Sequence, residues 1–464
     1  MDSPNRPALA GLLLAALTLL TALGVAGVLH LGGDLRPPGG LGGVHGGGGH
    51  TDTLRAVLLA LAVVTVVARG LGVLLQRVLG QPAVIGEIIA GLVLGPSVLG
   101  ALAPSWQQAI LPDEAAPSVG LIAKVGVVLF MFLLGLELDP RVLRDSGRTA
   151  LQVAIPSILL PFLLGTGLSL WLYPRYAGGV SFTLFTLFIG VCTSVTAFPV
   201  LARILSERRL QATRLGVLAL SAAAINDVVA WTLLLLLVGL AQARLSEALW
   251  TLPALGLYLA GLVWIARPAM AWLAAREERE TGPLRHGVLA VVFVSLLGSA
   301  WITELLGVHA LFGAFLLGVV MPHEGRLASH LHRSMEDVVL VLFLPAFFAF
   351  TGMRTQVGLV TDAQGVLATG AIIAVASAGK LLGTALAARA SGLGWRPASA
   401  LGVLMNTRGL MELVVLNVGL DLGVITPALF TMFVIMALVT TFATSPLLGW
   451  ILPARAFADD PTRP

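Results

Sequence analysis

The sequence predicts an all-α protein that crosses a membrane many times, and three observations support this fold class. Hydrophobic residues make up 57% of the 464 residues, charged residues only 11%, and the mean hydropathy is +0.94. Soluble domains hold about one-quarter charged residues. Apolar runs repeatedly reach the roughly 20 residues that span a bilayer as a helix. Because lipid offers the backbone no hydrogen bonds, runs of this length predict a helical bundle.

We expect 13–14 transmembrane helices joined mostly by short loops. The first apolar segment is compatible with two interpretations: small residues within it suit a cleaved signal sequence, and its length favours a retained span. The apolar segments cover residues 8–31, 54–79, 82–102, 119–137, 149–173, 183–205, 210–240, 249–274, 284–305, 309–321, 334–352, 363–390, 396–421 and 425–452.

These segments divide the chain into three parts. Residues 1–53 hold the first segment and a glycine-rich linker, residues 54–452 form the membrane domain, and residues 453–464 form a short tail. The tail is too short for a folded domain, so we expect no attached nucleotide-binding domain and no intracellular output module.

The arginines predict the topology. Sixteen fall in one set of alternate loops and five in the other, which is a positive-inside bias that places the C-terminus in the cytoplasm of a plasma membrane protein. Because the basic residues are scattered through short loops, the pI of 9.8 does not indicate nucleic-acid binding. The lipid bilayer is therefore the expected partner.

Signatures of enzymes and pumps are missing. The sequence holds no G-x-S-x-G elbow and no G-x-x-x-x-G-K-[ST] loop for ATP, and His323-Glu324 lacks the second histidine of a helical zinc site. Cys192 is the only cysteine, which excludes an intramolecular disulfide and a thiolate metal site. We therefore expect no enzyme activity, no cofactor and no resident metal.

Asp227 is the leading candidate for a functional residue. It follows Asn226 in the middle of the apolar segment 210–240. A carboxylate near the centre of a membrane helix costs about 2.5–3.5 kcal/mol, so it persists only if it is paired, protonated or bound to an ion. The pair Asn226-Asp227 therefore predicts an ion or proton site inside the bilayer.

Segment 183–205 contains Thr193, Ser194 and Thr196 just before Pro199. Proline removes a helical hydrogen bond and kinks or breaks the helix. The freed carbonyls can be satisfied by the hydroxyls or can coordinate a cation. From the residues alone, a simple proline kink and a broken helix at an ion site remain equally open.

Segment 396–421 is a second interrupted span, in the other half of the chain. It places Asn406, Thr407, Arg408 and Glu412 at membrane depth. Two interrupted spans in separate halves indicate a transporter site. Arg408 and Glu412 are four residues apart, so they share a helix face and can neutralise each other, and we favour a structural role for this pair.

Three further charged residues lie within apolar segments. Lys380 is one of only two lysines and sits in the middle of its span, where, unlike arginine, it can release a proton. Lys124 lies near a helix start, and we expect it to extend to the membrane interface. Glu87 lies among glycines that permit close helix packing, so it lines an access funnel or accepts a hydrogen bond from a neighbouring helix, and we favour the second role slightly.

The combined motifs resemble the monovalent cation:proton antiporters of the second large antiporter family, which includes bacterial sodium or potassium/proton antiporters and plant cation/proton exchangers. The resemblance covers roughly residues 54–452. The matching stretches are VIGEIIAGLVLGPSVLG, LFMFLLGLELDP, CTSVTAFPVLARIL, AAAINDVVAW, HALFGAFLLGVVMP, LFLPAFFAFTGM and NTRGLMELVVLNVG.

This resemblance implies a homodimer in which each subunit has a scaffold domain and a six-helix core built of inverted repeats. Segments 183–205 and 396–421 would be the two broken helices that cross in the core. Asp227 matches the family's aspartate that carries the cation and the proton, and Lys380 falls where the family has a basic residue. The crossing stretches would supply Thr193, Ser194, Thr196, Asn406 and Thr407.

Asn226 departs from the two-aspartate pattern of electrogenic family members. A single carboxylate carries one proton or one monovalent cation in each cycle, so we expect electroneutral exchange of Na⁺ or K⁺ for a proton by alternating access, and a role in pH homeostasis. The alternatives are a cation channel and a K⁺ efflux protein without strict proton coupling.

Overall fold

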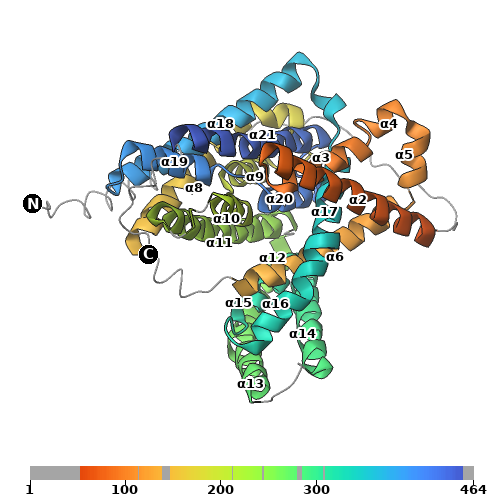
Figure 1. Ribbon diagram of the computed structural model, residues 1–464, viewed down its shortest axis with the longest axis vertical. Helices are drawn as coiled ribbons and strands as arrows, with labels where there is room; N and C mark the ends of the chain where they lie inside the picture. The colour runs from red at the N-terminus through yellow and green to blue at the C-terminus, as the bar shows by residue number, and fades with distance from the viewer. Residues whose placement is uncertain are drawn as a thin grey trace, which may run out of the picture.

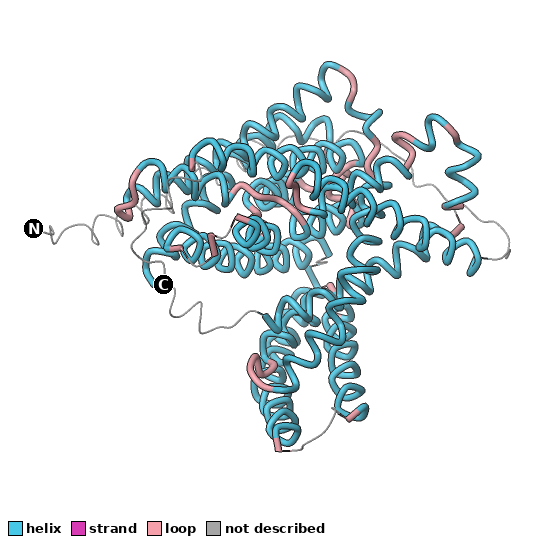
Figure 2. The backbone as a smooth tube through the Cα atoms, viewed as in Figure 1, coloured by secondary structure: helices cyan, strands magenta, loops and turns pink. Residues whose placement is uncertain are grey.

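A computed structural model describes residues 53–112, 114–137, 147–208, 210–211, 213–242, 245–279, 285–306 and 309–452. Within these ranges the chain is helical and forms no β-strand. The helices run through the whole bundle, and short loops interrupt them inside it as well as at its ends (Figure 2). The predicted segment 8–31, the glycine-rich linker and the tail 453–464 lie outside the described residues.

Six spans form one body, which we call the core. It contains a unit of helix, broken helix and helix that occurs once in each half of the chain, as the predicted inverted repeat requires. The first unit is α8 (Gly147–Tyr176), α9 (Phe182–Ser194) with α10 (Phe198–Glu207), and α11 (Arg214–Gln242). The second is α18 (Ala363–Ala390), α19 (Trp395–Met405) with α20 (Leu410–Asp421), and α21 (Pro427–Ile451).

The remaining spans form a second body, the scaffold, in which α2, α3, α6 and α17 pack on one another, α15 packs against α6, and α14 packs against α15. In Figure 1 the ends of α13 to α16 project from the rest of the bundle. The helices before the core are α2 (Thr53–Leu79), α3 (Ala83–Leu94), α4 (Leu99–Leu102), α5 (Pro104–Ile110) and α6 (Ala116–Glu137). After α11 come α12 (Leu245–Gly261), η1 (Leu262–Ala266), α13 (Arg267–Glu278), α14 (His286–Leu305), α15 (Ala310–Val320), α16 (Arg326–Val338), η2 (Val339–Phe343), α17 (Leu344–Met353) and η3 (Val357–Val360).

The predicted spans agree with the helices of the described ranges. Eleven helices are long and apolar enough to cross a membrane, and the bent pair α19 and α20 makes up to twelve. The predicted segment 309–321 forms the short apolar helix α15, which falls below the length of a full span. The expected all-α polytopic fold is therefore confirmed.

Glycines bring α8 and α18 close enough to join the two halves of the core. A Cβ at Gly379 would lie 2.5 Å from Cα of Pro161, and one at Gly383 would lie 2.5 Å from the carbonyl oxygen of Pro156. Any larger residue at either position would push the helices apart. This close packing places Lys380 of α18 beside the polar residues of α8 and α11.

Candidate functional site

The two broken helices meet at their interruptions in the middle of the core. Residues 195–197 separate α9 from α10, and residues 406–409 separate α19 from α20. The backbone N–H of Ala197 donates to the Thr407 carbonyl at 3.0 Å, and Thr196 Oγ1 donates to the Met405 carbonyl at 2.9 Å. The predicted pair of crossing broken helices is therefore confirmed.

Glycine permits this close crossing on one side. A Cβ at Gly409 would lie only 2.6 Å from Cγ2 of Val200 and 3.2 Å from Cβ of Ala197. On the other side, Pro199 falls in the first turn of α10, where its missing N–H removes no helical hydrogen bond. The sequence thus favours a break at both places, as the Gly and Pro residues indicated.

Arg408 occupies the carbonyl end of α9. Its Nη1 and Nη2 atoms donate to the carbonyls of Cys192 and Thr193 at 2.9 and 2.6 Å, and Nη1 lies 3.0 Å from Glu412 Oε2. Both side chains of this ion pair have no solvent exposure. A cation is stabilised at a helix C-terminus, so Arg408 satisfies carbonyls that the break leaves free.

Lys380 lies at the centre of a network of neutral groups. Its Nζ donates to Thr196 Oγ1 at 2.6 Å and lies 3.2 Å from the Asn226 side-chain oxygen, when that amide is oriented with its oxygen toward donors. In this orientation the Asn226 oxygen also accepts from Ser157 Oγ at 3.0 Å, and the amide nitrogen donates to the Ala154 carbonyl at 3.2 Å. The three core elements α8, α11 and α18 are thereby joined at one point.

Asp227, next to Asn226 on α11, is excluded from this network. Its exposed fraction is 1%, and neither carboxylate oxygen accepts a well-formed hydrogen bond from the described residues. No described cation lies within ion-pairing distance of it, although the N-terminus of α10 at Phe198 lies beside it. A buried carboxylate without a well-formed hydrogen bond is strongly destabilised while it is ionised, unless a cation or a proton joins it.

The other predicted residues of the crossing use their hydroxyls locally. Thr193 Oγ1 lies 2.9 Å from the Pro161 carbonyl, and Ser194 and Thr407 donate to carbonyls one turn earlier in their own helices. Asn406 donates to Ser377 at 3.4 Å, and its side-chain oxygen has no donor among the described residues. These residues line the crossing with oxygen atoms. Unlike Thr196, they make no hydrogen bond with Lys380.

Glu87 lies away from the crossing, in a cavity between the two bodies. It lines a cavity of about 590 Å³ that also reaches Pro199 of α10 and Leu410 of α20. Glu87 Oε1 lies 3.7 Å from Nη1 of Arg69. Glu336 and Asp337, which nothing in the sequence singled out, line the same cavity and add two carboxylates to its wall.

Ser157 is a further residue of the site that the sequence did not single out. It is buried between Pro156 and Pro161, two of the three prolines of α8, and contacts Asn226 directly. A hydroxyl flanked by Pro156 and Pro161 in an otherwise apolar span was the available signal. Proline frees backbone carbonyls inside a membrane helix, and polar side chains gather at such places.

Comparisons with known proteins agree with this geometry. The family model described as sodium/hydrogen exchanger, transmembrane, matches residues 50–453. The chain is 41% identical over 409 residues to the Na(+)/H(+) antiporter NhaS4 of Synechocystis sp., covering 88% of this chain and 99% of that protein. It is 40% identical over 405 residues to cation/H(+) antiporter 18 of Arabidopsis thaliana, and 37% identical over 385 residues to K(+)/H(+) antiporter 1 of Saccharomyces cerevisiae.

The plant and yeast relatives are much longer than this chain. The match covers 87% of this chain but 50% of the plant protein, and 80% of this chain but 44% of the yeast protein. Among solved structures, the sodium proton antiporter MjNhaP1 from Methanocaldococcus jannaschii has a TM-score of 0.59 at 15% identity, covering 86% of this chain and 96% of that chain. That likeness supports the fold, and the family model together with NhaS4 shows that this chain belongs to the sodium/hydrogen exchanger family of monovalent cation:proton antiporters.

Proposed function

We propose that this chain is a secondary active transporter that exchanges a monovalent cation, Na⁺ or K⁺, for a proton by alternating access. One observation carries the proposal. Asp227 is a buried carboxylate without a well-formed hydrogen bond from the described residues, while its neighbours Asn226, Thr196 and Lys380 satisfy one another. A site of this kind takes up either a proton or a cation, and competition between the two couples their movements.

The cation would be held by Asp227 together with oxygen atoms of the crossing. Thr193, Ser194, Thr196 and Thr407 contribute hydroxyls there, and Asn406 contributes a side-chain oxygen without a donor among the described residues. Carboxylate, hydroxyl and carbonyl oxygens are the usual ligands of hard cations. The transported ion is the substrate, and the mechanism requires no resident metal or cofactor.

The exchange would be electroneutral, with one cation for one proton. Only Asp227 offers a carboxylate at the shared site, because Asn226 is neutral. Lys380 donates to a hydroxyl and to an amide oxygen, both neutral, so it can keep the same charge in both halves of the cycle. The site then carries the same total charge in the proton-bound and cation-bound states.

Alternating access would come from movement of the core against the scaffold. The cavity lined by Glu87 lies between these bodies and extends to the first turns of α10 and α20. The loops on this face belong to the set with the larger share of arginines, so the positive-inside rule places it in the cytoplasm. We infer that the structure faces inward, in a plasma membrane, with a cytoplasmic C-terminus.

We also infer a homodimer, as in the family that the motifs resemble. Helix α2 is one of the least buried spans, with 28% of its apolar window buried within the subunit. This leaves an apolar face for a second copy or for lipid.

The test is cation-driven proton movement in proteoliposomes. A pH-sensitive dye inside the vesicles, titrated with Li⁺, Na⁺, K⁺ and Rb⁺, should report proton flux and identify the transported ions. Asp227→Asn should remove the flux. A cation channel or an uncoupled efflux protein would instead conduct cations without moving protons, and that result would refute the proposal.

A further inference from the structure

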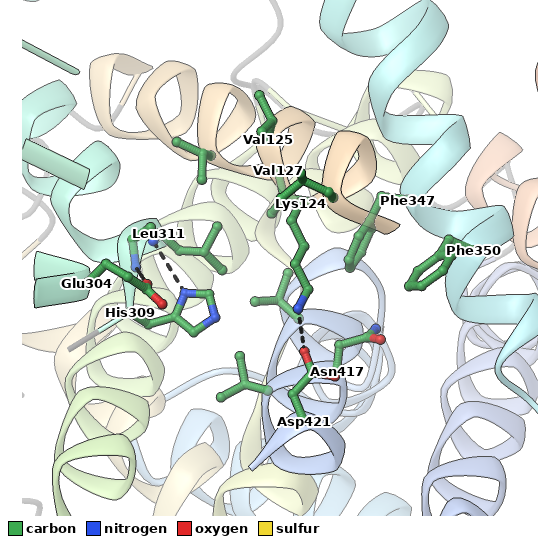
Figure 3. Close-up of a pocket in the computed structure, with 15 residues that line it drawn as sticks. Lys124, Val125, Val127, Glu304, His309, Leu311, Phe347, Phe350, Asn417 and Asp421 are labelled. Atoms are coloured by element: carbon green, nitrogen blue, oxygen red, sulfur yellow. Dashed lines mark hydrogen bonds and ion pairs between the residues drawn. The ribbon is translucent and has the colours of Figure 1, made fainter. Parts of the chain in front are cut away.

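A second cavity lies between the core and the scaffold, at the opposite end of α20 from Leu410. Its volume is about 250 Å³, and its wall is mostly apolar. Val127 and Val128 come from α6, Phe347 from α17, and Val414 and Val418 from α20. Figure 3 shows Lys124 crossing this cavity from α6 to the end of α20.

Three charged residues connect the two bodies across the cavity. Asp421, the last residue of α20, accepts from Lys124 Nζ at 2.7 Å and from Arg354 Nη2 at 2.8 Å. Lys124 lies on α6, and Arg354 directly follows α17, so both cations belong to the scaffold while Asp421 belongs to the core. Lys124, which we expected to extend to the membrane interface, thus also forms an ion pair with the core.

Neighbouring contacts strengthen this connection. Arg354 Nη1 donates to Asn417 Oδ1 at 2.8 Å, and Asn417 Nδ2 donates to Thr351 Oγ1 of α17 at 2.9 Å. The Arg354 guanidinium also lies 6.0 Å from the ring centre of Phe430, on core helix α21. We call Lys124, Arg354, Asn417 and Asp421 the α20 latch.

The other charged groups of the cavity do not cross between the bodies. Glu304 Oε2 accepts from the Ala310 backbone N–H at 2.7 Å, and both residues belong to the scaffold. Burial lowers the pKa of His309, so its ring is neutral at pH 7, and the charges of Lys124, Glu304 and Asp421 surround it. At neutral pH the ion pairs of the latch are therefore the only charged links across this cavity among the described residues.

We propose that the α20 latch is the outer gate of the transporter: it holds the core against the scaffold in the inward-facing state, and outward opening requires Asp421 to leave Lys124 and Arg354. This inference rests on the exchange mechanism and orientation proposed above. The cavity beneath the latch is then the closed form of the outer access path. It ends at Val414, one turn beyond Leu410, which lines the inner cavity.

The gate makes the ion pairs part of the transport cycle. A partly exposed ion pair is a weak contact, and Lys124 and Asp421 have side-chain exposures of 50% and 32%. Two such pairs can favour the inward-facing state over the outward-facing state without preventing the change between them. Removing the Asp421 charge should therefore raise the outward-facing population by about five- to tenfold.

Cysteine labelling tests the gate directly. In a Cys192→Ala background, Val418→Cys places a thiol in the closed outer cavity, and a membrane-impermeant maleimide is added from outside. Asp421→Asn, which removes both ion pairs, should accelerate labelling by about five- to tenfold. Lys124→Met, which leaves the Arg354 pair in place, should accelerate it by about two- to fivefold, whereas Lys124→Arg should stay near the wild-type rate. Glu304→Gln is the matched control, because it makes the same carboxylate-to-amide change in the same cavity without crossing between the bodies.

Transport kinetics give a second readout that a merely structural role would not produce. The apparent KM for the cation should fall in right-side-out vesicles and rise in inverted vesicles, because apparent affinity follows the population of the accessible state. Unchanged labelling in a folded, active Asp421→Asn or Lys124→Met protein would overturn the gate. That outcome would not argue against cation-proton exchange. Conversely, exchange that survives Asp227→Asn would refute the proposed function, and the labelling rates would still show whether the latch closes the outer cavity.

Discussion

Glu412 and Asp227 are both buried carboxylates in the core of this protein, with exposed fractions of 0% and 1%, but their surroundings differ. Glu412 lies 3.0 Å from Arg408, four residues earlier in the chain, and the arginine itself donates to two carbonyls of α9. Asp227 has no well-formed hydrogen bond from the described residues. The nearest lysine, Lys380, is instead engaged with Thr196 and Asn226.

This difference distinguishes a structural charge from an exchangeable one. A carboxylate with a permanent partner stabilises a fixed arrangement, and removing the partner leaves an uncompensated buried charge. A carboxylate without a partner must gain and lose one from solution, which is what a carrier of ions requires. We therefore expect substitutions at the two positions to affect different properties.

Replacing Asp227 should have the largest effect on transport and little effect on stability. Asp227→Asn removes the only carboxylate of the shared site, so cation-driven proton flux should fall to the background of empty vesicles. Because the substitution removes an unpaired buried charge, the Tm in detergent should stay the same or rise. Asp362→Asn is the control, since asparagine also caps a helix N-terminus and α18 should remain intact. If the Asp227→Asn variant retained the flux, Asp227 would not be the exchangeable carboxylate.

Replacing Arg408 should have the opposite effect. Arg408→Met leaves Glu412 and two carbonyls of α9 without their donor, and breaking a buried pair costs about 3–5 kcal/mol of unfolding free energy. Thermal unfolding in detergent, compared with Arg389→Met on the exposed side of α18, measures the difference. If both variants unfolded at the wild-type temperature, the Arg408–Glu412 pair would not be a structural element.

Much of this arrangement can be predicted from the sequence because membranes make polar residues conspicuous. Asp227, Lys380 and the two interrupted spans stand out against apolar surroundings. Each raises the free energy of inserting its helix into lipid, so each indicates a function or a partner. Ser157 does not stand out, because a serine in a membrane helix can bond to its own backbone, and the Ala154 carbonyl lies 2.7 Å from Ser157 Oγ. Its contact with Asn226 follows from the packing of α8 against α11.

The α20 latch is a second contact that the sequence alone does not predict. Lys124 and Asp421 are 297 positions apart, and each lies near a helix end, where charges are common. Helix periodicity identifies neighbours on the same helix but cannot identify partners on two separate bodies. The pairing depends on how the core rests against the scaffold, which one sequence does not specify.

Asn226→Asp should change the charge moved in each cycle. The Asn226 oxygen already lies 3.2 Å from Lys380 Nζ, so a carboxylate there would pair with the lysine and add a second group that exchanges protons. An imposed potential of 100 mV acts on each net charge with about 2.3 kcal/mol. The variant should therefore respond to valinomycin-set potentials, whereas the wild type and the neutral control Asn226→Ser should not. A wild-type protein driven by potential would contradict electroneutral exchange.

Ser157→Ala should have the smallest effect and tests whether the network around Lys380 matters for the site. It removes one hydrogen bond to Asn226, which is worth about 1 kcal/mol, so the apparent cation affinity should weaken by about fivefold.

The matched control is Ser169→Ala, a buried serine on the same helix that bonds to Thr186 and Thr166 away from the network. Both variants lose one buried hydroxyl from α8 and should lose similar stability. Only Ser157→Ala should shift the cation concentration that gives half-maximal proton flux, because only Ser157 contacts the residue beside Asp227. An equal shift in both variants would mean that the network stabilises α8 without positioning the site.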